Sequence, residues 1–116
     1  MIKIYSYKNC SSCKKAISFL KEKGIAYEEL AIRETPPSTA ELKHVLTKGG
    51  YELKKLFNVS GQDYRALNMK EKLPTMTEDE ALALLASNGN LIKRPFVVTE
   101  TSGLVGFKDA DWGVLL

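Results

Sequence analysis

The sequence predicts an α/β domain in which a mixed sheet, built from a β-α-β half and a β-β-α half, carries an inserted helical subdomain. Three observations lead to this prediction. A strand, a helix and a strand follow one another within residues 2–32, helical patterns fill residues 36–90, and two short strands and a last helix end the chain. The 116 residues suffice for one such domain and are too few for two ordinary ones.

The β-α-β unit is the strongest architectural signal in the chain. Residues 2–7 alternate β-branched and aromatic side chains with period two, as a strand does. Apolar residues recur at helical spacing from Ser12 to Lys23, and Gly24 is expected to end this helix. Residues 26–32 form the next expected strand. A helix between two strands predicts parallel pairing through a right-handed crossover.

Two capping boxes mark helices in the middle of the chain. Ser38 with Glu41 opens a helix that two glycines end, and Thr77 with Glu80 opens another that runs to the turn at residues 88–90. Short helical pieces are expected between them.

Sheet structure is expected again near the end of the chain. Pro95 introduces an apolar, β-branched run at residues 96–99, and residues 104–105 are its expected hairpin partner. Asp109 is expected to cap a last short helix that contains Trp112. The complete order is that of a thioredoxin-like fold with a helical insertion.

The whole chain, residues 1–116, is expected to form one domain. Its thioredoxin-like core would comprise about residues 1–35 and 91–116, and the helical insertion about residues 36–90. No internal repeat interrupts this scheme.

Composition excludes several other classes. Hydrophobic residues make up 44% of the chain and charged residues 27%, which is unlike disordered, collagen-like or coiled-coil sequences. The net charge of +3 is too small to indicate a nucleic-acid binder. No apolar run approaches the ~18 residues of a spanning helix, and the first residues lack the pattern of a secretory signal. The expected location is therefore the cytoplasm, without direct contact to nucleic acid or membrane.

Cys10 and Cys13 lie where the first strand ends and the first helix begins. Unpaired backbone N–H groups at a helix N-terminus stabilise an anion, so a thiolate is favoured there. Five lysines and no acidic residue within residues 1–21 add positive potential. Cys10, the more exposed member, is expected to be the attacking thiolate, and Cys13 to resolve the mixed disulfide. Backbone groups of Ser11, Ser12 and Cys13 would donate to the Cys10 sulfur.

Two other uses of the cysteines stay open. A closed zinc site needs four ligands, and only His44 is available beyond the two cysteines, so zinc would need a half-site shared across a dimer. An inert structural disulfide is the other alternative, although such bonds are uncommon in the cytoplasm. Redox or nucleophilic use is favoured because the cysteines stand at a strand-to-helix junction. No metal or nucleotide cofactor is implied.

Arg94 and Pro95 form the second candidate feature. In a thioredoxin-like sheet the loop before this strand lies beside the N-terminus of the first helix, and a cis peptide there, which we favour, turns backbone groups toward the thiol. Arg94 would then point its guanidinium toward the Cys10 loop as the partner of an anion or thiolate. The residues expected to bind an anion or glutathione are Ser11, Ser12, Lys14, Arg94 and Pro95.

Four segments of the chain resemble the arsenate reductase ArsC/Spx family. They are residues 5–16, which contain both cysteines, and residues 34–37, 53–58 and 93–98. The resemblance covers nearly the whole chain in the right order and implies a thioredoxin-like core with an inserted helical subdomain.

Arsenate reductases of this family attack arsenate with one cysteine, bind the oxyanion with three arginines, and are reduced with glutathione and glutaredoxin. The resemblance places that cysteine at Cys10 and one arginine at Arg94. The second arginine falls on or near Asn58, and the third near Phe107 or Lys108. Two of the three oxyanion arginines are therefore missing, which makes arsenate reduction the third choice.

The cysteine spacing resembles the Spx-like branch, whose members use such a pair as a redox switch and bind RNA polymerase through the carboxyl-terminal domain of its α-subunit. Those regulators generally extend past the last core helix, whereas this sequence stops at Leu116. The leading hypothesis is therefore a cytoplasmic thiol–disulfide oxidoreductase, with glutathione as co-substrate and glutaredoxin or thioredoxin as redox partners. A redox-responsive regulator that binds RNA polymerase is the alternative.

Overall fold

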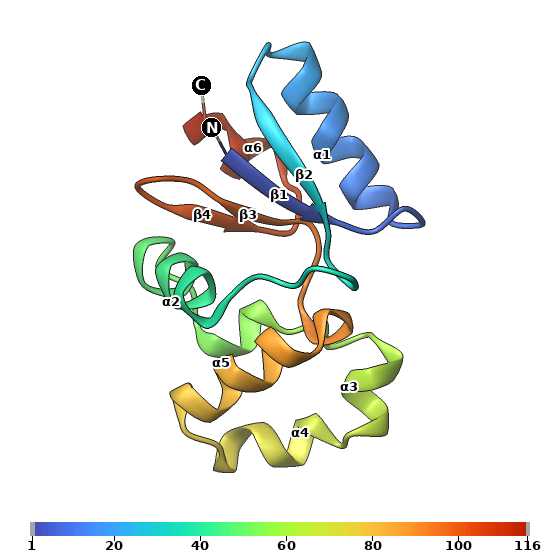
Figure 1. The fold of residues 1–116 in the computed structure, drawn as a ribbon, viewed down its shortest axis with the longest axis vertical. Coiled ribbons are helices and arrows are strands. Elements are labelled where there is room, and N and C mark those ends of the chain that lie inside the picture. Colours follow the sequence, from blue (N-terminus) through green and yellow to red (C-terminus); the bar gives the residue numbers. More distant parts are fainter. Residues whose placement is uncertain (1, 116) are drawn as a thin grey trace.

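A four-stranded mixed sheet occupies the upper half of the molecule in the computed structural model (Figure 1), with strand order β2-β1-β3-β4. β1 and β2 are parallel, as the β-α-β pattern predicts, and β3 is antiparallel to both β1 and β4. The thioredoxin-like mixed sheet predicted from the sequence is thus confirmed. The strands are β1 (Ile2–Ser6), β2 (Tyr27–Ala31), β3 (Phe96–Val98) and β4 (Gly103–Val105).

The structure describes residues 2–115, with the exception of the side chains of Asp109 and Val114. The helices from α2 to α5 gather below the sheet, whereas α1 and α6 flank it above (Figure 1). None of the helices within the described range is long and apolar enough to cross a membrane. The α-helices are α1 (Ser11–Glu22), α2 (Thr39–Lys48), α3 (Gln62–Ala66), α4 (Met69–Lys72), α5 (Glu78–Ser87) and α6 (Asp109–Trp112), and the 3₁₀ helices are η1 (Leu53–Leu56), η2 (Leu73–Thr75), η3 (Gly89–Leu91) and η4 (Gly113–Leu115).

Helix α1 begins and ends close to the predicted limits. Cys10 is its N-cap residue, and the helix buries one face, on which Cys13, Ala16 and Leu20 lie. Gly24 follows the helix with a φ angle of 66°, a left-handed conformation that glycine adopts without steric cost. The glycine therefore ends the helix, as the sequence predicts, and returns the chain toward β2.

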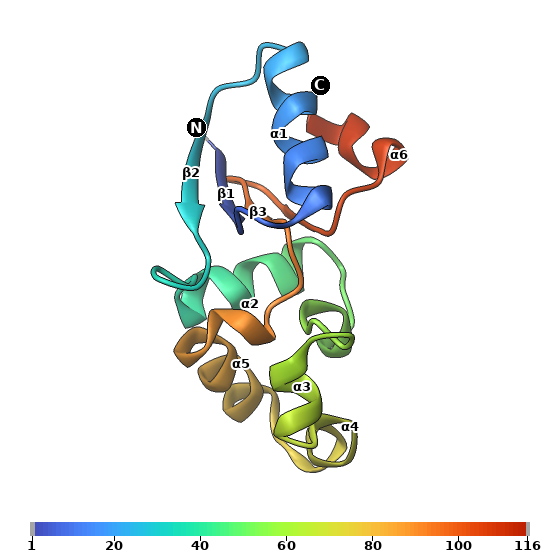
Figure 2. The same ribbon diagram turned by 90° about the vertical axis from the view of Figure 1, so that its right-hand side faces the viewer.

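The two faces of the sheet bury different sets of side chains. Ile4 and Val97 point to the side of α1 and α6 and pack with Leu20 and Trp112. Their neighbours along the strands, such as Tyr5, belong to the second core, which contains the apolar residues of α2 and α5. This alternation is the period of two expected for a sheet covered on both faces. Figure 2 shows α1 and α6 together on one side of the strands.

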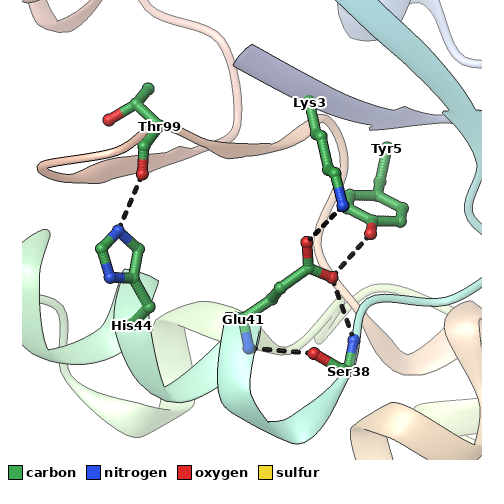
Figure 3. Close-up of polar contacts among 6 residues, drawn as sticks. All are labelled: Lys3, Tyr5, Ser38, Glu41, His44 and Thr99. Carbon is green, nitrogen blue, oxygen red and sulfur yellow. Dashed lines mark hydrogen bonds and ion pairs between the residues drawn. The ribbon is translucent and has the colours of Figure 1, made fainter. Parts of the chain in front are cut away.

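A carboxylate on α2 connects this helix to β1 (Figure 3). Glu41 accepts hydrogen bonds from the Tyr5 hydroxyl at 2.7 Å and the Ser38 backbone N–H at 3.2 Å, and its second oxygen lies 3.2 Å from Lys3 Nζ. Burial opposes ionisation of Glu41, but these three donors and the Lys3 charge hold its pKa below the usual value. Burial, followed by the same carboxylate, raises the pKa of Tyr5. The predicted capping residue therefore also joins α2 to the sheet.

The predicted helix caps have different outcomes. The capping boxes at the starts of α2 and α5 are both present. The predicted cap at Asp109 is wrong, because α6 begins at Asp109 itself and its N-cap residue is Lys108. His44 is half-buried on α2, and its Nε2 lies 2.8 Å from the Thr99 carbonyl oxygen (Figure 3). This histidine therefore connects α2 to the end of β3.

Candidate active site

Cys10 occupies the turn between β1 and α1. Its backbone N–H donates to the Tyr7 carbonyl oxygen at 3.0 Å, and its extended conformation makes it the N-cap of α1. The Cys13 backbone N–H donates to Cys10 Sγ at 3.2 Å, so the sulfur takes the place that a serine or aspartate oxygen fills in other helices. Cys10 is half-buried and is a free thiol. A negative charge on this sulfur would face the positive end of a three-turn helix.

Cys13 differs from Cys10 in its surroundings, because it is buried in the first turn of α1 with 1% of its surface exposed. The pKa of the Cys13 thiol is raised to about 12, chiefly by burial and then by its hydrogen bond with Cys10. A backbone hydrogen bond at Tyr7 and the positive charge of Arg94 act in the opposite direction. Cys13 is therefore a protonated thiol at neutral pH, held next to the sulfur of Cys10.

The raised pKa of Cys13 predicts a loss of stability in alkali. The unfolded chain releases this proton near the ordinary thiol pKa of 9.0, whereas the folded chain keeps it to about 12. Stability from this group is thus fully present below pH 9 and falls as the pH rises further. We expect the free energy of unfolding, measured by urea denaturation, to drop more steeply in the wild type than in Cys13→Ala, by up to about 1.4 kcal/mol per pH unit. Parallel curves for the two proteins would contradict the assigned pKa.

The Arg94–Pro95 peptide is cis, in agreement with the form favoured from the sequence. Pro95 is buried and Arg94 is half-buried, with its guanidinium carbon 5.0 Å from the centre of the Tyr7 ring. Tyr7 accepts the backbone hydrogen bond of Cys10, so the arginine stacks on the segment that leads into the cysteine turn. The charge of Arg94 also acts on the Cys13 sulfur, as the pKa of that thiol shows.

A cavity of about 470 Å³ opens beside the start of α1, and we call it the α1 cavity. Ser12 and Arg94 form part of its wall, together with Gly106 and Phe107 from the segment after β4. Four cationic side chains line it against two carboxylates, so the cavity has a positive balance suited to anionic groups. The charged lining residues are Glu52, Lys55, Lys93, Arg94, Lys108 and Asp111.

The structure separates some of the residues that the sequence predicts to bind an anion. Ser12 and Arg94 share the α1 cavity, whereas Ser11 is exposed. Lys14 points elsewhere, into a depression that it shares with Phe19 and Phe107. The reason is helical geometry, because Lys14 lies two residues after Ser12 and so faces a different side of α1.

Asn58, which stands at or near the place of a family arginine, lines a different cavity together with Arg94. Phe107 and Lys108, near the place of the other absent arginine, line the α1 cavity. Arg94 thus lies between the two cavities, and one of the missing arginine positions borders each of them.

Arg33 is a candidate residue that the sequence analysis did not identify. Its guanidinium carbon lies 4.1 Å from the centre of the Tyr7 ring, so Arg33 and Arg94 both stack on this ring. The strand order could have indicated this contact, because Tyr7 and Arg33 follow the carboxyl ends of β1 and β2. Adjacent parallel strands place such residues at the same edge of the sheet.

No three His, Cys, Asp or Glu side chains come together to hold a metal within the part of the chain that the structure describes. The cysteines are also not joined to each other, since both are free. The arrangement around Cys10 therefore consists of a helix N-terminus, a buried second thiol and a nearby guanidinium.

Comparison with known proteins identifies relatives of the whole chain. The model of the ArsC family matches residues 5–115. YusI from Bacillus subtilis is 51% identical over 105 residues, covering 90% of this chain and 89% of its own. A crystal structure of an ArsC family related protein from Bacteroides fragilis superposes with a TM-score of 0.94 at 46% identity, covering 99% of this chain and 97% of that one.

Relatives with different activities occur at lower identity. An arsenate reductase from Neisseria meningitidis is 32% identical over 106 residues, which is 90% of this chain and 89% of that protein. The global transcriptional regulator Spx from Listeria monocytogenes is 27% identical over 111 residues, which is 96% of this chain and 83% of the regulator. The match of the family model over nearly the full length, together with these relatives, shows that the chain belongs to the ArsC family.

Proposed function

We propose that the protein is a cytoplasmic thiol–disulfide oxidoreductase that uses Cys10 as nucleophile and Cys13 as resolving thiol, with glutathione as electron donor. One observation carries this proposal. The Cys10 sulfur is the N-cap acceptor of a twelve-residue helix, while the sulfur three residues later is buried and its pKa is raised. The helix N-terminus favours the thiolate at the first position and burial favours the thiol at the second, which is the division of roles that disulfide exchange requires.

The exchange would proceed in two steps. The Cys10 thiolate attacks one sulfur of a substrate disulfide, the S–S bond breaks, and the other sulfur leaves as a thiolate. Cys13 then loses its proton to solvent and attacks the Cys10 sulfur, so that a Cys10–Cys13 disulfide forms and the second substrate thiolate leaves. The substrate has gained two electrons. Two molecules of glutathione return two electrons to the cysteines and leave as glutathione disulfide.

The α1 cavity supports an anionic thiol as the partner in this exchange. Glutathione carries two carboxylates, and the lysines and arginine of the cavity provide charge-assisted donors for one of them. Arg94 lines the cavity and its charge reaches the Cys13 sulfur, so it would orient one carboxylate or stabilise a thiolate.

A coupled assay tests this proposal. The wild-type protein is mixed with reduced glutathione and a peptide–glutathione mixed disulfide, and the glutathione disulfide that forms is measured through NADPH consumption by glutathione reductase. We expect NADPH consumption to rise in proportion to the protein. A rate no higher than without protein, when Cys10 is shown by alkylation to be reduced, would overturn the proposed activity.

The Spx-like relatives favour a second candidate, a redox-responsive regulator that binds RNA polymerase. In that case a Cys10–Cys13 disulfide would change a binding surface and would not turn over substrate. Capture of the RNA polymerase α-subunit by this protein, with and without oxidant, separates the two candidates. Capture that depends on oxidation, together with no NADPH consumption, would favour the regulator.

Arsenate reduction is the third candidate, and the arsenate reductase relatives favour it. Arg33 adds a second guanidinium to the cavity of Asn58 and Arg94, but the position near Phe107 brings no guanidinium to the α1 cavity, so the set of three arginines that holds the oxyanion in the arsenate reductases is incomplete. If the oxidation of glutathione in the presence of glutaredoxin depends on arsenate, arsenate reduction becomes the favoured function.

A further inference from the structure

A second cavity, of about 370 Å³, lies on the other side of Arg94, and we call it the α3 cavity. Arg33 and Arg94 line it, together with Asp63 of α3 and Asn90 of η3. The cavity therefore combines two positively charged donors with two groups that accept hydrogen bonds.

The two guanidiniums are available to a ligand. Their guanidinium carbons lie over the Tyr7 ring, 4.1 Å from its centre for Arg33 and 5.0 Å for Arg94, and a cation–π contact of this kind does not itself consume a guanidinium N–H donor. Among the side chains that the structure describes, neither guanidinium lies within 4.0 Å of a carboxylate. Two unpaired guanidiniums in one cavity are suited to bind a carboxylate through charge-assisted hydrogen bonds.

The Asn90 and Asp63 side chains can each accept a further hydrogen bond. Asn90 Oδ1 is buried and has no hydrogen-bond partner within the described part of the chain. Leaving a buried amide oxygen unpaired destabilises the fold, so a donor is expected there. Asp63 carries a negative charge nearby, and among the side chains that the structure describes only its Oδ2 has a partner, accepting from Asn88 Nδ2 at 3.0 Å. A primary ammonium group would supply both the donor and the opposite charge.

Gly89 brings the segments that carry these groups together. A Cβ atom at this position would overlap the Ile32 carbonyl oxygen and would come within 3.3 Å of Arg33 Cα. The chain after β2 therefore lies directly against η3, and in Figure 1 this loop passes beside the orange segment that leads from α5 to β3. Arg33 and Asn90 are neighbours because residue 89 has no side chain.

We propose that the α3 cavity binds the α-amino carboxylate end of a small thiol or disulfide substrate. The carboxylate would lie between Arg33 and Arg94, and the ammonium would donate to Asn90 Oδ1 and Asp63. This inference rests on the proposed thiol–disulfide exchange and specifies its substrate class. Because Arg94 also lines the α1 cavity, at the start of α1, the rest of a substrate held in this way would extend past Arg94 toward the cysteine turn. The γ-glutamyl end of glutathione and free cysteine both carry the required group.

Binding of S-methylglutathione, measured by calorimetry, tests the inference without any redox step. We expect Arg33→Gln to weaken binding about tenfold, as the loss of a charge-assisted contact worth about 1.4 kcal/mol does. The matched control is Arg65→Gln, since Arg65 is an exposed arginine of α3 that does not line the cavity. We expect this control to bind as the wild type does.

The ammonium subsite has its own test. N-acetyl-S-methylglutathione lacks the ammonium and should bind about tenfold more weakly than S-methylglutathione to the wild type. Asn90→Ala should weaken binding of S-methylglutathione and leave the weak binding of the acetylated compound unchanged. S-methylcysteine distinguishes free cysteine from glutathione as the ligand that carries the α-amino carboxylate. If it binds as tightly as S-methylglutathione, free cysteine is the ligand. If it binds more weakly, glutathione is the ligand.

Three results would overturn the inference: no binding of S-methylglutathione to the wild type, equal binding to Arg33→Gln, or equal binding of the acetylated compound. Its failure is distinguishable from failure of the proposed function. Exchange activity without S-methylglutathione binding removes only the subsite. Binding with the expected losses, but without exchange activity, supports the subsite and contradicts the proposed exchange.

Discussion

Replacing Cys10 with serine is expected to reduce thiol–disulfide exchange to the rate of the uncatalysed reaction. A serine hydroxyl does not ionise near neutral pH, so the variant has no sulfur to attack a disulfide and Cys13 remains a buried, protonated thiol. The fold should persist, because serine is a favourable N-cap residue and its oxygen can accept the bond that the Cys13 backbone N–H now donates to sulfur. Alkylation by iodoacetamide measures the loss of the reactive thiol, and the coupled glutathione assay measures the loss of exchange.

Cys13→Ser is the matched variant, because it removes the other sulfur of the same turn. We expect Cys10 to remain open to alkylation in this protein and, after treatment with glutathione disulfide and removal of free thiol, to persist as a mixed disulfide with glutathione, since Cys13 can no longer release it. Mass spectrometry of the intact protein detects the adduct. Alkylation that is equally fast in the wild type and in Cys10→Ser, or failure of Cys13→Ser to retain an adduct, would remove these roles from the cysteines.

Features that depend on residues close in sequence were predictable. The N-cap position of Cys10 and the capping boxes at Ser38 and Thr77 involve contacts that reach only three residues along the chain. The β-α-β pattern predicts the parallel pairing of β1 and β2 for a similar reason, since a helix of known length must return the chain to the sheet edge.

Features that depend on the relative placement of distant segments were not predictable. Glu41 was identified as a capping residue, but its bonds to Tyr5 and Lys3 depend on where α2 packs against β1. Arg33 reaches Tyr7 because β2 lies next to β1 in a particular register, with Ala31 opposite Ser6. The spacing of residues along one segment indicates neither how a helix packs on a strand nor in which register two strands pair.

The second guanidinium beside Asn58 is the clearest example. Asn58 stands at or near one of their positions, and the sequence indicates only that a guanidinium is absent there. The structure places Arg33, from the loop after β2, in the same cavity as Asn58 and Arg94. A positive charge can therefore be supplied to one site from different segments of a fold, and alignment to a motif does not detect this.

Trp112→Ala is expected to lower the free energy of unfolding by about 3–5 kcal/mol, the usual cost of removing a large aromatic side chain from a core. Trp112 is fully buried and packs edge-on against Phe19 and Phe107, with ring centres 5.8 and 5.0 Å away. Its Nε1–H donates to the Gly106 carbonyl oxygen at 3.1 Å. One residue of α6 thus holds both α1 and the segment that follows β4, and urea denaturation measures its contribution.

Trp112→Phe separates packing from the hydrogen bond. Phenylalanine retains an aromatic ring but leaves the Gly106 carbonyl without its donor, so we expect a smaller loss of about 1–3 kcal/mol. Because Gly106, Phe107 and Lys108 line the α1 cavity, the alanine variant should also slow exchange with glutathione under conditions where it is still folded. Alkylation of Cys10 should change little, since its sulfur is positioned by the start of α1. Exchange at the wild-type rate in folded Trp112→Ala would show that the α1 cavity does not bind the substrate.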